Sequence, residues 1–213
     1  RYVVFDVATT KDLSQATLYD VEEKALGKNA GALRRKSFSL GRASARRSLD
    51  TLSILKGAIT IGQRGQPVWP PGIIGSISHT QNVATSVVAR RSDCLALGID
   101  VESEKRKLSP GVQKRICRPE ESLWLKQAST PWLPLAVFSA KESIFKAFYP
   151  LNHTELVFQD AQLTWLADRH CFQAILHRSA SPGYPSGYRF PVFVWRQGGL
   201  IFTAVVLAST FSC

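Results

Sequence analysis

The chain has 213 residues, 45% of them hydrophobic, which is enough to bury one large core or the cores of two small lobes. Lys and Arg number 27 against 16 for Asp and Glu, so the formal net charge of +11 favours polyanionic ligands or an acidic protein partner. This composition excludes a chain that is mostly disordered, and no apolar run approaches the length of a membrane span.

Hydrophobic spacing in the first half predicts a strand, a long helix and three further strands. Residues 2–7 form a short apolar run typical of a strand, and residues 33–52 carry apolar side chains at helical spacing. Beyond a stretch rich in Gly and Pro, apolar runs at 73–77, 83–89 and 95–101 follow one another closely. Three short strands in succession favour a meander.

The predicted helix is strongly basic. Between residues 24 and 47 there is no Asp or Glu, and the basic side chains are Lys24, Lys28, Arg34, Arg35, Lys36, Arg42, Arg46 and Arg47. Helical geometry places Arg35, Arg42 and Arg46 almost in line beside the apolar stripe. Like charges stacked in this way repel and need a compensating anion, which favours a phosphate site over the alternative of a solvated helix face.

The second half predicts helices followed by strands. A helix opens at Pro119-Glu120-Glu121, and another surrounds residues 138–148 and is expected to stop at Pro150. Strand-like runs follow at 161–166, 171–177, 188–195 and 200–207. Since both halves run from helix to strands, we expect an α+β fold of two similar lobes, residues 1–98 and 99–213, each a helix with an antiparallel sheet, and a site in the crevice between them.

Two acidic clusters predict a site for a divalent cation. Asp100 and Glu102 end an apolar run, and positions i and i+2 of a strand project from the same face, so both carboxylates can reach one ion. Glu142 and Lys146 lie four residues apart on one face of a predicted helix, which makes Glu142 a third oxygen ligand. Three carboxylates suit Mg²⁺ and leave coordination positions for a pyrophosphate.

Each cluster also has an ordinary interpretation. An Asp-x-Glu at a strand end is commonly a solvated turn, and Glu142 with Lys146 is commonly a surface ion pair. Taken singly, these interpretations are favoured. Their joint occurrence with the polar turn Gly75-Ser76-Ile77-Ser78-His79 favours a phosphate site instead, with Ser78 and His79 as candidate contacts.

The cysteines predict no zinc site. Cys94, Cys117, Cys171 and Cys213 are scattered without the spacing of metal ligands, so we expect free thiols in a reducing compartment. With no signal-like segment at the N-terminus, a cytoplasmic location is expected.

Five motifs occur along most of the chain. They are Arg34-Arg35-x-x-Phe38-x-x-Gly41-Arg42-x-x-Ala45-Arg46, Gly65-x-Pro67-x-Trp69-Pro70, Gly75-Ser76-x-Ser78-His79, Gly98-Ile99-Asp100-x-Glu102 and Ser139-Ala140-Lys141-Glu142-x-x-x-Lys146-Ala147-x-x-Pro150. In this order and approximate spacing, the sequence resembles the 4′-phosphopantetheinyl transferases, and within them the enterobactin-synthase-associated subset. The resemblance implies their pseudo-twofold fold, with nucleotide binding in the first lobe and the metal ligands and catalytic helix in the second.

The resemblance also implies ligands for each site residue. Asp100, Glu102 and Glu142 would bind Mg²⁺, with Mn²⁺ as an alternative, together with the pyrophosphate of coenzyme A as co-substrate. The basic and polar residues implied to hold coenzyme A are Arg34, Arg42, Arg64, His79, Lys141 and Lys146, to which the basic stripe adds Arg46 and the polar turn adds Ser78.

The reaction implied is attack by a serine of an acyl or peptidyl carrier protein on the β-phosphate of coenzyme A, which releases adenosine 3′,5′-bisphosphate. The catalytic residues expected are Glu142, which takes the serine proton directly or through water, Lys146, which steadies the departing oxygen, and Asp100 as a metal ligand. We expect an acidic carrier protein as partner, no nucleic acid, no membrane span and a monomer, since the crevice lies within one chain.

Two alternatives remain open. A metal-dependent nuclease would also use paired acids, nearby lysines and a basic surface, and a basic nucleic-acid-binding domain would use the basic helix on backbone phosphates. Neither predicts the turn at residues 75–79 or the loop at residues 65–70.

Overall fold

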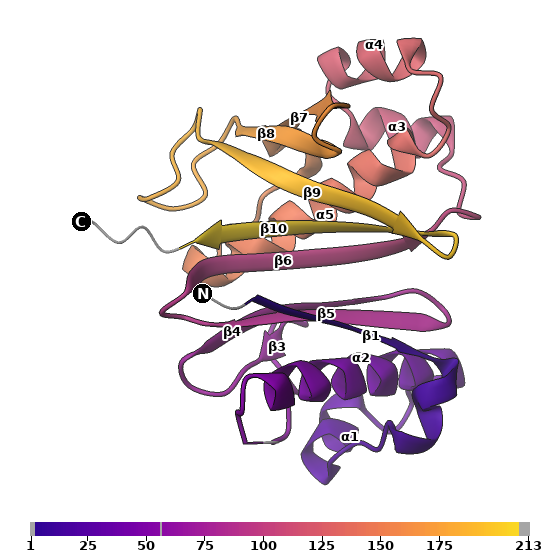
Figure 1. Ribbon diagram of the computed structural model, residues 1–213, viewed down its shortest axis with the longest axis vertical. Coiled ribbons are helices and arrows are strands. Elements are labelled where there is room, and N and C mark those ends of the chain that lie inside the picture. The colour runs from indigo at the N-terminus through magenta and orange to yellow at the C-terminus, as the bar shows by residue number, and fades with distance from the viewer. Residues whose placement is uncertain (1–2, 56, 209–213) are drawn as a thin grey trace. The chain divides into compact units, whose positions relative to one another are not determined.

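The computed structural model describes residues 3–55 and 57–208, and the chain divides into two compact units (Figure 1). Of the described residues, those up to Leu97 belong to the first unit together with Ala208, and the second unit comprises Gly98–Leu207. Each unit combines helices with a β-sheet, so the prediction of an α+β fold is confirmed. The assignment of nucleotide and metal binding to separate lobes stays a prediction.

In the first unit a long helix covers a three-stranded sheet. The elements are β1 (Val3–Thr9), the 3₁₀ helix η1 (Thr10–Gln15), α1 (Asp20–Leu26), α2 (Ala32–Thr51), β2 (Thr60–Ile61), β3 (Pro67–Val68), β4 (Ile73–His79) and β5 (Val83–Arg90). β5 lies between β1 and β4 with antiparallel pairing, and β2 pairs with β3. α2 packs along β1 and β5 and buries Leu40, Ala45 and Leu49 against them, as the helical spacing of its apolar residues predicts. The expected strand at residues 2–7 is β1, and Tyr2 lies outside the described residues.

In the second unit a five-stranded sheet packs on the other long helix. The elements are β6 (Cys94–Ser103), which begins in the first unit, α3 (Pro110–Ile116), α4 (Pro119–Gln127), α5 (Leu133–Asn152), the 3₁₀ helix η2 (Phe158–Asp160), β7 (Ala161–Leu166), β8 (Cys171–Leu176), β9 (Arg189–Gln197) and β10 (Leu200–Ala208). The strand order is β6-β10-β9-β8-β7. Phe148 of α5 packs against Phe190 of β9 in the core, with ring centroids 5.2 Å apart.

β6 crosses α5 at very close range. A Cβ atom added at Gly98 would lie 1.9 Å from the carbonyl oxygen of Ser143 and 2.7 Å from the backbone nitrogen of Ala147. Only glycine therefore allows the strand backbone to touch the helix backbone at this point. The contact holds the residues that follow Gly98 beside α5.

Two details of the predicted fold are wrong. The third strand of the expected meander is β6, which belongs to the five-stranded sheet beside β10, because it is buried along most of its length and is held to α5 through Gly98. Pro150 does not stop α5, which continues to Asn152 before His153 adopts a left-handed φ of 51°. A proline in the last turn of a helix removes only one hydrogen bond, so the turn persists.

Among the described residues, no helix is both long and apolar enough to cross a membrane. Cys94, Cys117 and Cys171 are buried free thiols, as expected. Cys213 lies outside the described residues.

Candidate functional site

Asp100 is held in place by contacts from α5. Its carboxylate is almost fully buried at the end of β6. Lys146 Nζ donates to Asp100 Oδ1 at 2.7 Å, and Ser139 Oγ donates to Asp100 Oδ2 at 2.7 Å. Ser139 also shares a 2.9 Å hydrogen bond with Thr203 Oγ1 of β10. The strand residue is thus fixed by a cation and a hydroxyl that come from two turns of the same helix.

Glu102, two residues further along β6, lies in a similar electrostatic setting. Its side chain is 13% exposed and pairs with Arg106, whose guanidinium also lies 4.5 Å from the centroid of the Phe138 ring. Burial, and then the charge of Asp100, raise the pKa of Glu102 to about 7, although Arg106 and Lys146 act in the opposite direction.

Glu142 lies on α5 one turn before Lys146, as the four-residue spacing predicts. Burial raises the pKa of its carboxyl group, the charge of Lys146 acts against this rise, and the charge of Asp100 adds to it. Among the described residues, no side chain donates a hydrogen bond to this carboxylate. Because Asp100 affects both Glu102 and Glu142, the three acids form one electrostatic group.

This group of acids fits a divalent cation by its chemistry. Within residues 3–55 and 57–208, no set of His, Cys, Asp or Glu side chains is already gathered around a single point that could hold an ion. Asp100 and Glu102 are instead each paired with a basic side chain. Burial and the charge of Asp100 raise the pKa of Glu102 and of Glu142, so a bound cation would stabilise the ionised forms of these two carboxyl groups. Oxygen ligands of this kind suit Mg²⁺. The three carboxylates therefore fit the ion by their chemistry, although in this structure Asp100 pairs with Lys146 and Glu102 pairs with Arg106.

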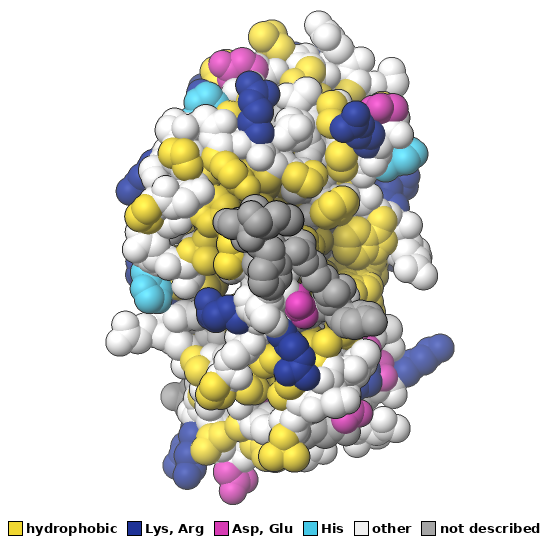
Figure 2. All heavy atoms as spheres, turned by 60° about the vertical axis from the view of Figure 1, so that its left-hand side comes forward, with side chains coloured by type: hydrophobic (Ala, Val, Ile, Leu, Met, Phe, Trp, Pro, Cys, Tyr) yellow, Lys and Arg dark blue, Asp and Glu magenta, His cyan; other side chains and the backbone are white. Residues whose placement is uncertain are grey.

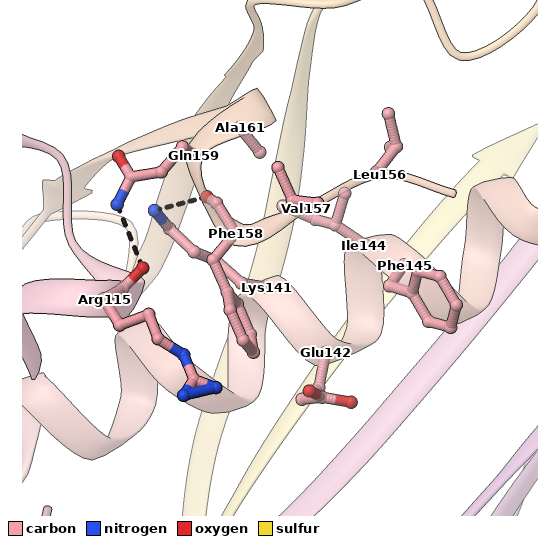
Figure 3. Close-up of a pocket in the computed structure, with 10 residues that line it drawn as sticks. All are labelled: Arg115, Lys141, Glu142, Ile144, Phe145, Leu156, Val157, Phe158, Gln159 and Ala161. Atoms are coloured by element: carbon pink, nitrogen blue, oxygen red, sulfur yellow. Dashed lines mark hydrogen bonds between the residues drawn. The ribbon is translucent and has the colours of Figure 1, made fainter. Parts of the chain in front are cut away.

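A cavity of about 550 Å³ opens next to Glu142 (Figure 3). Most of its wall is apolar, from α5 and from the segment that leads into β7. The lining residues are Arg115, Lys141, Glu142, Ile144, Phe145, Leu156, Val157, Phe158, Gln159 and Ala161. A carboxylate thus lies at the side of an apolar chamber of the size that small-molecule ligands occupy.

Lys141, expected to hold coenzyme A, points elsewhere. It is 3% exposed, and its ammonium group forms its hydrogen bonds inside the second unit. Figure 3 shows the side chain directed to the Phe158 carbonyl, away from the Glu142 carboxylate.

In the first unit, two arginines of the predicted coenzyme A site bond within the unit. Arg42 is 5% exposed, and its Nε donates to the Ile59 carbonyl at 2.7 Å. Burial lowers the pKa of Arg42 to about 10. Arg46 Nη1 donates to both oxygens of the buried Glu22 carboxylate, at 3.0 and 2.9 Å. Arg35, in line with them, pairs with Glu23.

These ion pairs supply the compensating charge that the basic stripe needs. Glu22 and Glu23 lie in the first turn of α1, just before the stretch that contains no acidic residue. Sequence reasoning missed them because α1 was not predicted. The acidic first turn of α1 is the signal that could have revealed this helix.

The remaining predicted phosphate contacts lie at exposed ends of elements. Arg34 is exposed in the first turn of α2, and Arg64 is exposed in the turn between β2 and β3. His79 is exposed at the end of β4, next to the buried Ser78. Lys36 of α2 donates to Asn82 in the β4–β5 turn at 2.7 Å, so the start of α2 and the end of β4 lie at the same edge of this unit.

Three polar residues at the acidic group were not predicted. Ser139 and Thr203 support Asp100, and Arg106 pairs with Glu102. Ser139 belongs to one of the sequence motifs, but its hydroxyl carries no signal of its partner. Thr203 lies in β10, far along the chain from Asp100, so only the folded sheet reveals the contact.

Comparisons with known proteins agree on one family. The 4′-phosphopantetheinyl transferase N-terminal domain matches residues 22–89, and the 4′-phosphopantetheinyl transferase superfamily matches residues 96–189. The chain is similar to 4′-phosphopantetheinyl transferase Svp of Streptomyces mobaraensis, with 38% identity over 88% of this chain and 78% of that protein. It is 32% identical to 4′-phosphopantetheinyl transferase PptT of Mycobacterium tuberculosis over 96% of both chains. It is 33% identical to enterobactin synthase component D of Escherichia coli O157:H7, over 84% of this chain and 82% of that protein.

Proposed function

Because the chain belongs to the 4′-phosphopantetheinyl transferase superfamily and so transfers phosphopantetheine, we propose that coenzyme A is the donor and that a serine of an acyl or peptidyl carrier protein is the acceptor. The serine oxygen bonds to the β-phosphorus of coenzyme A, and the bond from that phosphorus to the bridging oxygen breaks. Adenosine 3′,5′-bisphosphate leaves with the bridging oxygen. The observation that supports this proposal best is the group formed by Asp100, Glu102 and Glu142 with Lys146 beside it.

We assign Asp100, Glu102 and Glu142 as the residues that hold Mg²⁺, with Mn²⁺ as an alternative. When bound, such an ion would neutralise charge on the diphosphate. Ser139 keeps the Asp100 carboxylate oriented by its 2.7 Å hydrogen bond. Lys146, which pairs with Asp100 at 2.7 Å, supplies a positive charge for the departing phosphate oxygen.

Glu142 is the candidate to accept the proton of the serine. It is the one acid of the group to which no described side chain donates a hydrogen bond, and it lines the cavity. A carboxylate that both binds an ion and takes a proton must use different oxygens for the two roles. Positioning and charge neutralisation supply the rest of the rate, because phosphoryl transfer needs little covalent help from the protein.

The cavity beside Glu142 is suited to the pantetheine arm. The arm is long, and its methyl and methylene groups can lie against the apolar walls contributed by Ile144, Phe145 and Leu156, although its two amides and its hydroxyl need polar partners. An arm held there would bring its phosphate end to Glu142.

In the first unit, Arg34, Arg64, Ser78 and His79 are the candidates to hold the nucleotide phosphates. Arg42 and Arg46 would support them through the α2 contacts already described. An acidic carrier protein would suit the net charge of +11, and we propose a cytoplasmic monomer. On the face shown in Figure 2, most Lys and Arg side chains are surrounded by hydrophobic and uncharged atoms.

The test is transfer to a carrier protein followed by mass spectrometry. With coenzyme A and Mg²⁺ present, we expect the carrier to gain the mass of one phosphopantetheine arm. Glu142→Gln should lower turnover by about 100-fold or more, since a general base typically contributes that much. Glu104→Gln is the matched control, because Glu104 also lies in the second unit but pairs with Arg196 outside the acidic group. Near-normal turnover by Glu142→Gln would reject the role of Glu142, and no mass gain with the unaltered enzyme would reject the reaction.

A further inference from the structure

Lys141 lies directly before Glu142 on α5 and uses all the donors of its ammonium group. Its Nζ donates to Glu121 Oε2 at 2.7 Å, to the Ile116 carbonyl at 2.8 Å and to the Phe158 carbonyl at 2.9 Å. A lysine ammonium has three N–H donors, so none remains for a phosphate while the side chain lies here. Its side chain is only 1% exposed, which also separates the charge from solvent-borne ligands.

Glu121, the partner of Lys141, is equally saturated. It is 0% exposed, and its Oε1 accepts from the Leu163 amide at 2.7 Å. Its Oε2 accepts from the Arg118 amide at 2.6 Å in addition to Lys141. The pair therefore joins the end of α3, the start of α4, the middle of α5 and the beginning of β7.

A second set of contacts joins the segment between α3 and α4 to η2. Arg118 Nη1 donates to the Gln159 carbonyl at 2.7 Å. Gln159 Nε2 in turn donates to the carbonyls of Arg115 and Cys117, at 3.0 Å each. Phe158, Gln159 and Ala161 are wall residues of the cavity beside Glu142. The wall opposite α5 is thus attached to α5 through Lys141.

We propose that Lys141 is a positioning residue: paired with Glu121, it holds the cavity wall at residues 158–161 against α5 and so sets the place of the substrate arm relative to Glu142, without touching phosphate. This rests on the proposed function, since it takes the cavity as the site of the arm. It also reassigns Lys141 from the coenzyme A contacts that the sequence predicts.

A related arrangement occurs in the first unit. There the buried Glu22 accepts from Arg46 of α2 and from the Ile59 amide at 2.8 Å. A buried glutamate that ties a long helix to a later segment is therefore part of how both units are built. In the second unit, the basic member of the pair, Lys141, directly precedes the candidate base Glu142 in the sequence.

The test separates positioning from phosphate binding with Lys141→Met, which keeps the shape of the side chain and removes its charge. Titration calorimetry measures binding of adenosine 3′,5′-bisphosphate and of inorganic pyrophosphate, with Mg²⁺ present. We expect both dissociation constants to stay within about twofold of the unaltered enzyme. A rise of about tenfold or more is what loss of a charged hydrogen bond produces, and it would overturn the proposal.

Two further measurements detect the positioning itself. Amide hydrogen exchange of residues 158–163 should become faster in Lys141→Met without any ligand, and kcat at saturating coenzyme A should fall by at least about tenfold, since small misplacements of reacting groups are costly. Val192→Ala is the control for lost stability, because Val192 is buried in β9 outside the cavity wall. It should leave kcat and the exchange of residues 158–163 unchanged. Unchanged exchange in Lys141→Met, or an equal loss of kcat in Val192→Ala, would refute positioning.

Glu121→Gln keeps the proposal testable if Lys141→Met does not fold. This variant frees Lys141 from its charged partner, so a lysine able to bind phosphate would bind pyrophosphate more tightly than before. Positioning predicts faster exchange of residues 158–163 with no gain in pyrophosphate affinity, and a gain of tenfold would contradict it. The exchange measurements need no turnover, so they decide the role of Lys141 even if the enzyme fails to modify a carrier protein.

Discussion

The two units share a pattern of buried polar contacts but use it differently. In each, two serines one turn apart on the long helix meet a hydroxyl on a facing strand. Ser44 and Ser48 each lie 2.9 Å from Ser86 Oγ in the first unit. In the second, Ser139 and Ser143 lie 2.9 and 2.7 Å from Thr203 Oγ1.

The difference lies in the further partner of the first serine. Ser44 donates to the backbone carbonyl of Asp6 at 3.0 Å, whereas Ser139 donates to the carboxylate of Asp100. The same helix-to-strand contact therefore only joins elements in the first unit, but orients an acid in the second. Under the proposed function, the comparison teaches that a catalytic role is added to one of two similar helix-to-strand contacts.

Removing the buried glutamates should give the largest change. Glu121→Ala leaves the buried Lys141 ammonium without its partner, and we expect a loss of about 4 kcal/mol in the free energy of unfolding. Glu22→Ala should cost less, about 2 kcal/mol, because the side chain of Arg46 is 12% exposed and can recover some hydration. Urea unfolding measures both. Equal losses in Glu121→Ala and Glu22→Ala would show that the exposure of the basic partner, Lys141 or Arg46, does not set the cost.

Replacing the first serine of each pair sharpens the functional difference. Ser139→Ala removes the hydroxyl that orients Asp100, so we expect turnover to fall about tenfold and stability to fall by about 1 kcal/mol. Ser44→Ala should show a similar loss of stability without the loss of turnover. Steady-state transfer assays together with urea unfolding measure the two effects. A comparable loss of turnover in both variants would argue against a specific role for Ser139.

The stability of the second unit should depend on pH through Cys117, which lies near the buried Glu121. Burial, and then the charge of Glu121, raise the pKa of the Cys117 thiol to about 11. The folded state thus keeps this proton more tightly than the unfolded state, so the associated stability is present below the usual thiol pKa and is lost as pH rises towards about 11. We expect a loss of about 1 kcal/mol between pH 8 and pH 10 that Cys117→Ala does not show. The same slope in Cys117→Ala would assign the effect to other groups.

Removing an exposed ion pair should change the free energy of unfolding least, and by a similar amount in both units. Arg35 pairs with Glu23 in the first unit, and Arg196 pairs with Glu104 at 2.6 Å in the second. We expect Arg35→Ala and Arg196→Ala each to change the free energy of unfolding by about 0.5 kcal/mol, and less at high salt. A loss above about 2 kcal/mol in either variant would mean that the pair does more than its exposure suggests.

Periodic patterns made the local elements predictable. The helical spacing of apolar residues predicts α2 and α5, and the run at residues 161–166 coincides with β7. The short helices α1 and α3 were not predicted, because each has fewer than three turns in which the helical spacing of apolar residues could be recognised. At α3 the pair Ser109-Pro110 is a recognisable start, since Ser109 caps the helix and Pro110 opens it.

The site was predictable as a set of residue types but not as a set of contacts. Strand and helix periodicity place Asp100 with Glu102 and Glu142 with Lys146, because these pairs are close in sequence. That Lys146 pairs with Asp100, or that Glu121 occupies Lys141, depends on packing between distant segments. For the same reason, the line of Arg35, Arg42 and Arg46 gave no sign that α1 supplies its counter-charges.

Gly98 sets a limit on how the second unit can vary. A methyl group at this position would collide with the backbone of α5. Any other residue would therefore push β6, which carries Asp100 and Glu102, away from α5, which carries Glu142. The substitution would leave every charged group of the site chemically intact and yet separate them. Attempts to redesign the second unit must therefore keep glycine at position 98, because the backbone contact with α5 leaves no room for a side chain.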